Sequence, residues 1–274
     1  MLPLRIRYII ESALAEDIGP CDPLYSCLGE EVGEAVIQVR EDSVCSGAVL
    51  VEPVMAAVNP KITVSMNVQD GDPLTGGATI ASVRGSVRDI LTGERVLLNF
   101  LQRLSGIATL TDKFVRRVSG TGVKICDTRK TTPGLRYMEK YAVRCGGGHN
   151  HRFSLGDGVL IKENAIKAFG SIEKAVTSAR EIAHHLTKIE VEVENLEEFQ
   201  EALRCGVDGI LLDNMSPIDV ENAVRVGKGR ALLEVSGKIT LENVQEFAIP
   251  GVSIISSGLL THSAPAIDFS LNII

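Results

Sequence analysis

The stretch KIEVEVENLEEFQEALRCGVDGILLDN, residues 188–214, decides the fold of the second half of the chain. It contains an apolar run with alternating glutamates, then an amphipathic segment, then a second apolar run. This order predicts a strand, a crossover helix and a parallel strand. Asn195 precedes the amphipathic segment and is a typical helix N-cap.

The same unit recurs on both sides of this stretch. Short apolar runs that end in polar or charged residues predict six strands, at 123–130, 158–164, 188–195, 209–214, 231–237 and 252–258. Helical patterns separate most of these runs, with further N-caps expected at Ser216 and Thr240. No G-x-G-x-x-G phosphate loop is present, which favours an α/β barrel over a doubly wound sheet. The segment is short for a complete barrel, so we expect an incomplete one.

The residues before position 105 show a different pattern. An amphipathic helix is predicted in MLPLRIRYIIESALAED, residues 1–17. Short alternating or β-branched runs at hairpin-like spacing then predict strands, at 34–41, 47–53, 61–69 and 78–85. A helical pattern begins at Val87, and we expect it to break at Ser105-Gly106 and to resume through 109–117. An antiparallel sheet packed on helices follows from this pattern.

Composition narrows the class of protein. The 274 residues carry a net charge of −7, are 45% apolar and only 4% aromatic, and include no Trp. This excludes a disordered chain and argues against nucleic-acid partners. No apolar run approaches the roughly 20 residues that span a bilayer, so we expect no membrane partner. The six cysteines are scattered without a C-x-x-C pair, which indicates a reducing, cytoplasmic location.

The predicted strand ends carry most of the candidate chemistry, as expected for the active rim of a barrel. Residues 121–152 contain seven Lys or Arg against two Asp or Glu, a local charge of +5 in an acidic chain. A positive pocket of this kind suits a small, highly anionic substrate, although a solvated basic surface remains an alternative. Glu192 and Asp213 could stabilise a developing cation or hold Mg²⁺ through water. Glu190, Glu192 and Glu194 share one strand face, so some of them should pair with lysines such as Lys162 or Lys188.

Small residues lie at the ends of the last two predicted strands. Ser236-Gly237-Lys238 and Ser256-Ser257-Gly258 lie where barrels frequently bind phosphate. Simple turns are the alternative for each of them. His149 and His151 lack the spacing of a metal site, so hydrogen-bonding roles beside the arginines are favoured.

The run DTRKTTPGLRYMEKYAVRCGGGHNHR (127–152) makes the chain recognisable. Together with LTGERVLLNFLQRLSGIAT (91–109), VLIKEN (159–164) and LEVSG (233–237), it resembles the quinolinate phosphoribosyltransferases, also called nicotinate-nucleotide pyrophosphorylases (carboxylating). The resemblance implies an N-terminal α/β sandwich domain (1–105, with the tail 262–274 packed on it) and an open α/β barrel (106–261). It also implies a homodimer, or a higher oligomer, with shared active sites. The implied reaction joins quinolinate to phosphoribosyl pyrophosphate with Mg²⁺, giving nicotinate mononucleotide, CO₂ and pyrophosphate in NAD biosynthesis.

The resemblance also implies roles for individual residues. The quinolinate carboxylates would be bound by basic side chains, namely Arg129, Lys130, His151, Arg152 and Lys162, and Thr128 would also contact substrate. Arg95, preceded by Glu94, would reach in from the neighbouring subunit. Glu192 and Asp213 would flank the ribose and its Mg²⁺, and would act in catalysis with Lys130 and Lys162. The phosphate would be bound by the last two loops, at Ser236, Gly237, Lys238, Ser257, Gly258 and Leu259.

Two positions depart from the family pattern. Ala165 stands where the family usually has His, and Lys238 stands where Gly or Asn is common. Three alternatives remain open: a molybdenum-transport-associated relative, a Schiff-base barrel enzyme that uses Lys162, and a binding protein that has lost turnover. Retention of the T-R-K-T-T-P-G and I-K-x-N motifs argues against the first, and the paired arginines argue against the second.

Overall fold

Two compact units make up the chain, described by a computed structural model for residues 4–20, 27–29, 31–227 and 229–274. The first unit comprises Met1–Asp112, Thr132–Gly147 and Ser263–Ile274, and the second comprises Lys113–Thr131 and Gly148–His262. The expected domain boundaries near residues 105 and 261 stay predictions. Cys21 and the first three residues of the predicted N-terminal helix lie outside the described residues.

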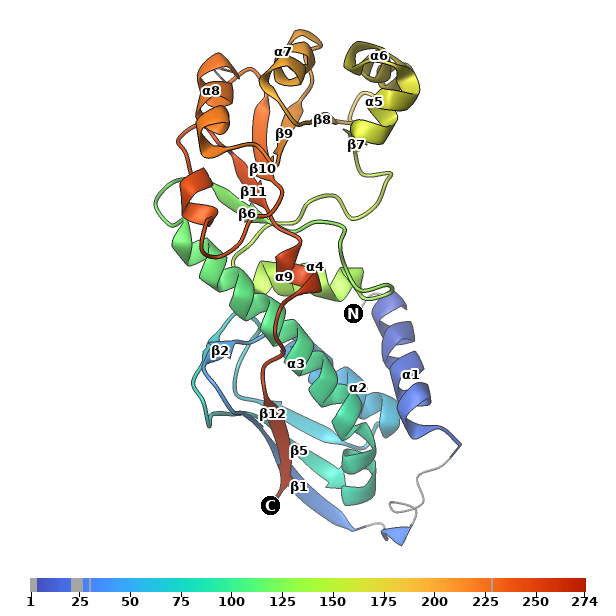
Figure 1. Cartoon of the computed structure of the whole chain (residues 1–274). Coiled ribbons are helices and arrows are strands. Elements are labelled where there is room, and N and C mark those ends of the chain that lie inside the picture. The colour runs from blue at the N-terminus through green and yellow to red at the C-terminus, as the bar shows by residue number, and fades with distance from the viewer. Residues whose placement is uncertain (1–3, 21–26, 30, 228) are drawn as a thin grey trace. The chain divides into compact units, whose positions relative to one another are not determined.

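An antiparallel sheet is the centre of the first unit. Its strand order is β12-β1-β5-β3, with bounds Phe269–Ile273, Val32–Val39, Thr79–Ser86 and Thr63–Met66. Alternate residues of β1 (Ala35, Ile37 and Val39) are fully buried, which is the period-two pattern of a strand with one face in the core. Figure 1 shows the C-terminal strand β12 lying beside β1, with Ile37 in register with Leu271. A small pair, β2 (Ser43–Val44) and β4 (Pro73–Leu74), completes the strands of this unit.

The first unit also contains helices, and one of them replaces a predicted strand. They are α1 (Leu4–Ile18), α2 (Val51–Val58), the first part of α3 (Val87–Arg117) and α4 (Arg136–Cys145). The strand predicted at 47–53 is wrong, because Gly47 at φ 101° leads into a 3₁₀ turn (Ala48–Leu50) and then α2. Pro53 falls in the first turn of α2, where its missing N–H is not needed. A short apolar run does not by itself distinguish a strand from a buried helix.

Helix α3 is continuous, so the predicted break at Ser105-Gly106 is wrong. Both residues serve packing. The Ser105 hydroxyl accepts the N–H of Ser46 at 3.0 Å and donates to its carbonyl at 3.1 Å. A Cβ at Gly106 would lie only 2.0 Å from the carbonyl oxygen of Pro265. The glycine therefore allows the C-terminal segment to cross close to the helix, at the modest cost of glycine within a helix.

A parallel sheet is the centre of the second unit. Its order is β6-β11-β10-β9-β8-β7, with bounds Lys124–Cys126, Ile254–Ser256, Leu232–Ser236, Gly209–Asp213, Ile189–Val193 and Val159–Ile161. All six strands predicted from the sequence are confirmed. Because β6 and β7 form the two edges of this sheet, the expected open barrel is confirmed as well.

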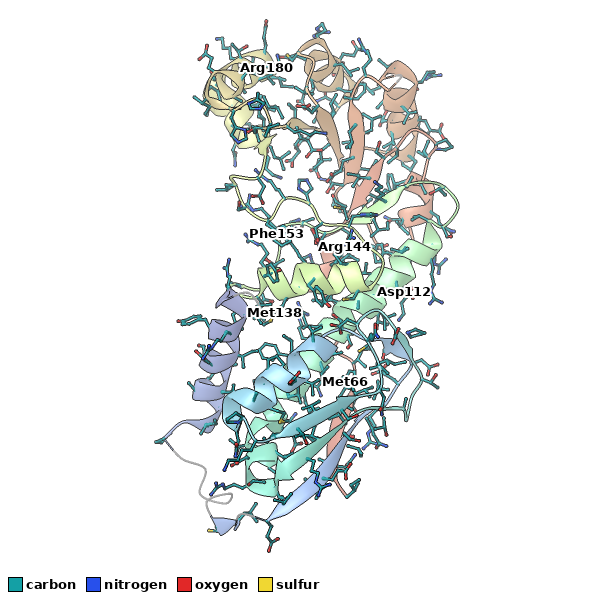
Figure 2. All side chains as sticks on the ribbon, turned by 180° about the vertical axis from the view of Figure 1, so that it is seen from behind. Met66, Asp112, Met138, Arg144, Phe153 and Arg180 are labelled. Atoms are coloured by element: carbon teal, nitrogen blue, oxygen red, sulfur yellow. The ribbon has the colours of Figure 1, made fainter. Side chains whose placement is uncertain are left out.

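The helices of this unit follow the strands along the chain. They are α5 (Glu163–Phe169), α6 (Ile172–Ile182), α7 (Leu196–Arg204), α8 (Pro217–Gly227) and α9 (Leu259–His262). Asn195 caps α7, as predicted, by accepting the N–H of Glu198 at 2.9 Å. Arg180 of α6, labelled in Figure 2, donates to the carbonyls of Cys205 and Gly206 just after α7. No helix of the described residues is both long and apolar enough to cross a membrane.

The helix predicted at 240–248 is wrong, since only a 3₁₀ turn forms at Val244–Phe247. Asn243, and not Thr240, makes the local side-chain contacts. Its carboxamide oxygen accepts the N–H of Thr240 at 2.8 Å, and its NH₂ group donates to the carbonyl of Lys238 at 3.1 Å. These bonds hold the segment in a loop where a helix would otherwise begin. The cap predicted at Ser216 is confirmed by its bond from the N–H of Asp219 at 3.2 Å.

Candidate active site

Polar residues gather at the carboxyl ends of the parallel strands. Parallel strands end at the same edge of a sheet, and register pairs Asp213 with Ser236 and Cys126 with Ser256 at that edge. The structure brings most of the predicted site residues to this edge or to the loops that follow it: Thr128, Arg129, Lys130, Lys162, Glu192, Asp213, Ser236, Gly237, Lys238, Ser257, Gly258 and Leu259. All of these residues belong to the second unit.

The basic side of the site contains two neighbouring guanidinium groups. Arg152 is half-buried, and its Nη1 donates to the carbonyl of Gly158 at 2.8 Å. Burial, and then the positive charge of Arg129, lower the pKa of Arg152 from its usual value. Two like charges held near each other in a partly desolvated site favour an anion between them. Arginine also offers the planar geometry that suits a carboxylate.

The basic run at 121–152 is divided between the two units. Arg136, Lys140 and Arg144 lie on α4 in the first unit, where Figure 2 labels Arg144. Lys124 is exposed at the amino end of β6. Of the basic residues in the second unit, Arg129 and Lys130 follow the carboxyl end of β6, and Arg152 is a neighbour of Arg129. The sequence count of +5 was correct, but neighbours in the chain separate when a helix and a loop intervene.

The acidic side of the site begins with an ion pair. The Lys162 ammonium contacts Oε2 of Glu192, which confirms the expectation that Lys162 pairs with a glutamate of the 189–193 strand. Asp213 accepts a hydrogen bond from the Asn214 carboxamide at 2.7 Å. Both Glu192 and Asp213 offer the hard oxygen atoms that Mg²⁺ prefers. Because each has an oxygen already bonded to a neighbour, the pair fits contact with the ion through water better than a complete protein cage.

The loop after β10 has an unusual backbone. Gly237 has φ 90°, and a Cβ there would lie 2.5 Å from the carboxamide oxygen of Asn214. Lys238 follows at φ 51° and is exposed. Left-handed backbone favours Gly or Asn, because a Cβ is disfavoured in this region. The lysine departs from this preference at a cost in backbone strain.

The loop after β11 contacts the loop after β6. Ser257 is buried, and its hydroxyl donates to the carbonyl of Ile239 at 2.9 Å. A Cβ at Gly258 would lie 2.8 Å from Cδ of Lys130, and the hydroxyl of Thr261 donates to the Lys130 carbonyl at 2.8 Å. The glycine and the threonine therefore position the segment that carries Arg129 and Lys130.

The acidic partners of His151 were not predicted from the sequence. Nε2 of His151 lies 3.3 Å from a carboxylate oxygen of Glu190 and 3.6 Å from one of Glu234. Burial, and then the charge of Glu190, raise the pKa of Glu234 to about 7. The three ligand atoms lie within 4.8 Å of one another, a spacing that a metal ion could bridge. A proton on Nε2 between the carboxylates accounts for the same geometry. The alternation of Glu190, Glu192 and Glu194 predicted a shared strand face, but it did not indicate the contact with His151.

Glu94 and Arg95 belong to a different unit from these residues. Both belong to α3 in the first unit, and Arg95 is exposed. Their predicted role in a site shared with a neighbouring subunit stays a prediction.

Comparisons with known proteins identify the family. The family model described as quinolinate phosphoribosyl transferase, C-terminal domain, matches residues 107–272, and the corresponding N-terminal domain model matches residues 24–105. A relative from Bacillus subtilis, named probable nicotinate-nucleotide pyrophosphorylase (carboxylating), is 43% identical over 98% of this chain and 94% of its own. The human nicotinate-nucleotide pyrophosphorylase (carboxylating) is 37% identical over 99% of this chain and 92% of its own.

Solved structures agree with these matches. NadC from Streptococcus pyogenes has a TM-score of 0.95 and 40% identity, covering 100% of this chain and 99% of its own. The nicotinate-nucleotide pyrophosphorylase from Francisella tularensis has a TM-score of 0.94 and 39% identity, covering 100% and 98%. With both domain models matched and identity of this level over nearly the whole length, the chain belongs to the quinolinate phosphoribosyltransferase family.

Proposed function

We propose that this chain catalyses the decarboxylating transfer of a phosphoribosyl group from phosphoribosyl pyrophosphate to quinolinate, a step of NAD biosynthesis. The products are nicotinate mononucleotide, CO₂ and pyrophosphate. The observation that carries the proposal is the pair of neighbouring guanidinium groups, Arg129 and Arg152, beside an acidic strand edge in a chain of this family. Quinolinate has two carboxylates, and the paired arginines supply complementary charge for them.

The two sides of the site have different tasks in this proposal. Arg129, Arg152 and Lys162 hold the carboxylates of quinolinate, so that its ring nitrogen approaches C1′ of the ribose. Glu192 and Asp213 stabilise the cationic character at C1′ as pyrophosphate leaves. The positive ring nitrogen formed by the attack then stabilises the carbanion left at C2 when the 2-carboxylate departs as CO₂, and a proton from solvent at C2 completes nicotinate mononucleotide. The loops at 236–238 and 257–259 bind the 5′-phosphate with backbone N–H groups.

The proposal includes Mg²⁺ as part of the phosphoribosyl pyrophosphate substrate, with Glu192 and Asp213 contacting its water. It also includes a homodimer in which Arg95 of one subunit completes the site of the other. Exposure of Arg95 supports this arrangement, because an exposed guanidinium is available to a second chain. The cysteines of the described residues are free thiols, which supports a reducing, cytoplasmic setting.

Pyrophosphate release tests the reaction directly. The full chain is incubated with phosphoribosyl pyrophosphate and Mg²⁺, with either quinolinate or nicotinate as acceptor. We expect pyrophosphate and CO₂ with quinolinate and neither product with nicotinate. Absence of release with both acceptors, from folded protein, would overturn the proposal and favour a binding protein. In that case Ala165→His is the first substitution to examine, because the family usually has His there.

Subunit exchange tests the shared site. Arg95→Ala and Arg129→Ala chains should each be inactive, since each lacks one cation of the carboxylate pocket. Mixed dimers should regain part of the activity, because one of their two sites then contains both wild-type arginines. Exchange that is demonstrated by mass spectrometry without recovery of activity would exclude a site built from two chains.

A further inference from the structure

Both ring nitrogens of His151 are engaged. Nδ1 accepts the backbone N–H of Arg152 at 2.8 Å, so Nδ1 carries no proton. Nε2 faces carboxylate oxygens of Glu190 and Glu234 at 3.3 and 3.6 Å. The ring proton therefore belongs on Nε2, where a carboxylate can accept it. The imidazole thus has a fixed tautomer and a fixed orientation.

The carboxylate below the imidazole is itself fixed. Glu234 lies in the middle of β10 and is only 1% exposed. Its second oxygen accepts the hydroxyl of Ser256, on the adjacent strand β11, at 2.6 Å. Two rigid strands therefore set the position of the acceptor that His151 faces.

A second buried carboxylate holds the same segment from the side of β6. Asp127 is fully buried, and one of its oxygens accepts the backbone N–H of His151 at 2.9 Å. Its other oxygen accepts the Asn150 carboxamide at 2.6 Å. This segment is thus held by Asp127, just after β6, through the His151 backbone, and by Glu234 of β10 through the His151 ring.

We propose that Glu234 and His151 are positioning residues for Arg152: Glu234, together with Glu190, holds the Nε2–H tautomer of His151, and Nδ1 of that tautomer holds the Arg152 backbone. The proposal rests on the proposed function only for the ligand of Arg152, a carboxylate of quinolinate. It assigns His151 a role through its neighbour in place of the direct carboxylate binding that the family resemblance implies, since both ring nitrogens already have partners. Ser256 belongs to the same chain of contacts.

Three substitutions of His151 separate this role from simple packing. His151→Leu removes both nitrogens and should raise the KM for quinolinate about ten- to hundredfold, as expected when a ligand-binding group loses its support. His151→Asn places a carboxamide oxygen near the position of Nδ1 and should recover most of that loss. His151→Gln reaches toward the Nε2 position and should recover little. The KM for phosphoribosyl pyrophosphate should change less than about twofold in all three.

Glu234→Leu tests the second residue at similar side-chain volume. We expect a severalfold rise in the KM for quinolinate with an unchanged KM for phosphoribosyl pyrophosphate. The matched control is Glu221→Leu, at an exposed position of α8, which should change neither constant. Recovery with Gln and not with Asn, or equal rises in both KM values, would overturn the proposal.

Nitrogen NMR of the ligand-free chain provides a readout that needs no turnover. The chain contains five histidines, so ¹⁵N-histidine labelling gives few signals, and their comparison with His151→Asn assigns residue 151. We expect an unprotonated Nδ1 and a protonated Nε2 for this ring. The opposite tautomer would refute the positioning role even if the enzyme is active. The expected tautomer in a chain that does not turn over quinolinate would instead refute the proposed function and leave the His151 geometry intact.

Discussion

Removing the charge of Glu234 should change the pH dependence of stability in a defined direction. The pKa of this carboxyl is raised from 4.5 to about 7 in the folded chain, first by burial and then by Glu190. His151, Lys162 and the Ser256 hydroxyl oppose the rise. Between these two pH values the folded chain holds a proton that the unfolded chain has lost, so stability falls as pH rises. The wild-type contribution is fully present below about pH 4.5 and is lost by about pH 7.

The size of this effect follows from the same interval. A tenfold change in proton affinity corresponds to about 1.4 kcal/mol, so the rise in pKa corresponds to at most about 3 kcal/mol of stability lost between pH 4.5 and 7.5. Glu234→Gln has no proton to lose and keeps a partner for Ser256. The free energy of unfolding of the variant relative to wild type should therefore increase by about 2–3 kcal/mol from pH 5 to pH 8.

Urea unfolding at pH 5 and pH 8 measures this difference. Far-UV circular dichroism is the suitable probe, because the chain has no Trp and its four Tyr lie outside the second unit. Glu221→Gln, an exposed acid on α8, is the matched control and should follow the wild type at both pH values. A difference between Glu234→Gln and wild type that stays constant with pH would refute the assignment of this buried titration to Glu234.

Further substitutions test other parts of the structure. Glu139→Gln should lower the free energy of unfolding by about 2 kcal/mol, because the buried carboxylate accepts two bonds from Arg103; urea unfolding measures it. Lys238→Gly should raise the unfolding free energy by about 1 kcal/mol through relief of left-handed strain, and no rise would show that the loop tolerates lysine without strain. Gly258→Ala should lower kcat/KM about tenfold by displacing Lys130, with the circular dichroism spectrum unchanged; full activity would refute the close packing.

Much of the fold could be predicted because burial follows local patterns. Each strand of the second unit is a short apolar run that ends in polar residues, and both features are visible in the sequence. The strand prediction for residues 47–53 was wrong because a short apolar run fits a strand and a buried helix equally well. The helix break predicted at Ser105-Gly106 was wrong for another reason. The partners that require small residues there, Ser46 and Pro265, come from distant parts of the chain.

The candidate site also has features that the sequence predicts and features that it does not. Residues at strand ends could be placed at one rim, because parallel strands share that edge whatever their order in the sheet. The basic run at 121–152 could not be divided correctly, since α4 carries Arg136 and Arg144 into the other unit. The contacts of His151 with Glu190 and Glu234 depend on the approach of a loop to two strands. No spacing in the sequence encodes that approach.

Glu234 is predicted to affect both stability and function, so the unfolding measurements and the KM measurements on its variants can be compared. Ionising the buried carboxyl of Glu234 costs the fold at most about 3 kcal/mol. That cost is a large fraction of the roughly 5–15 kcal/mol that typically stabilises a domain. If its purpose were structural, its removal should weaken the fold at pH 8. The geometry predicts the opposite, since loss of the charge should stabilise the second unit while the KM for quinolinate rises. A residue with these opposed effects is retained for positioning the site, and a variant that loses both stability and quinolinate affinity at pH 8 would show that Glu234 instead supports the fold.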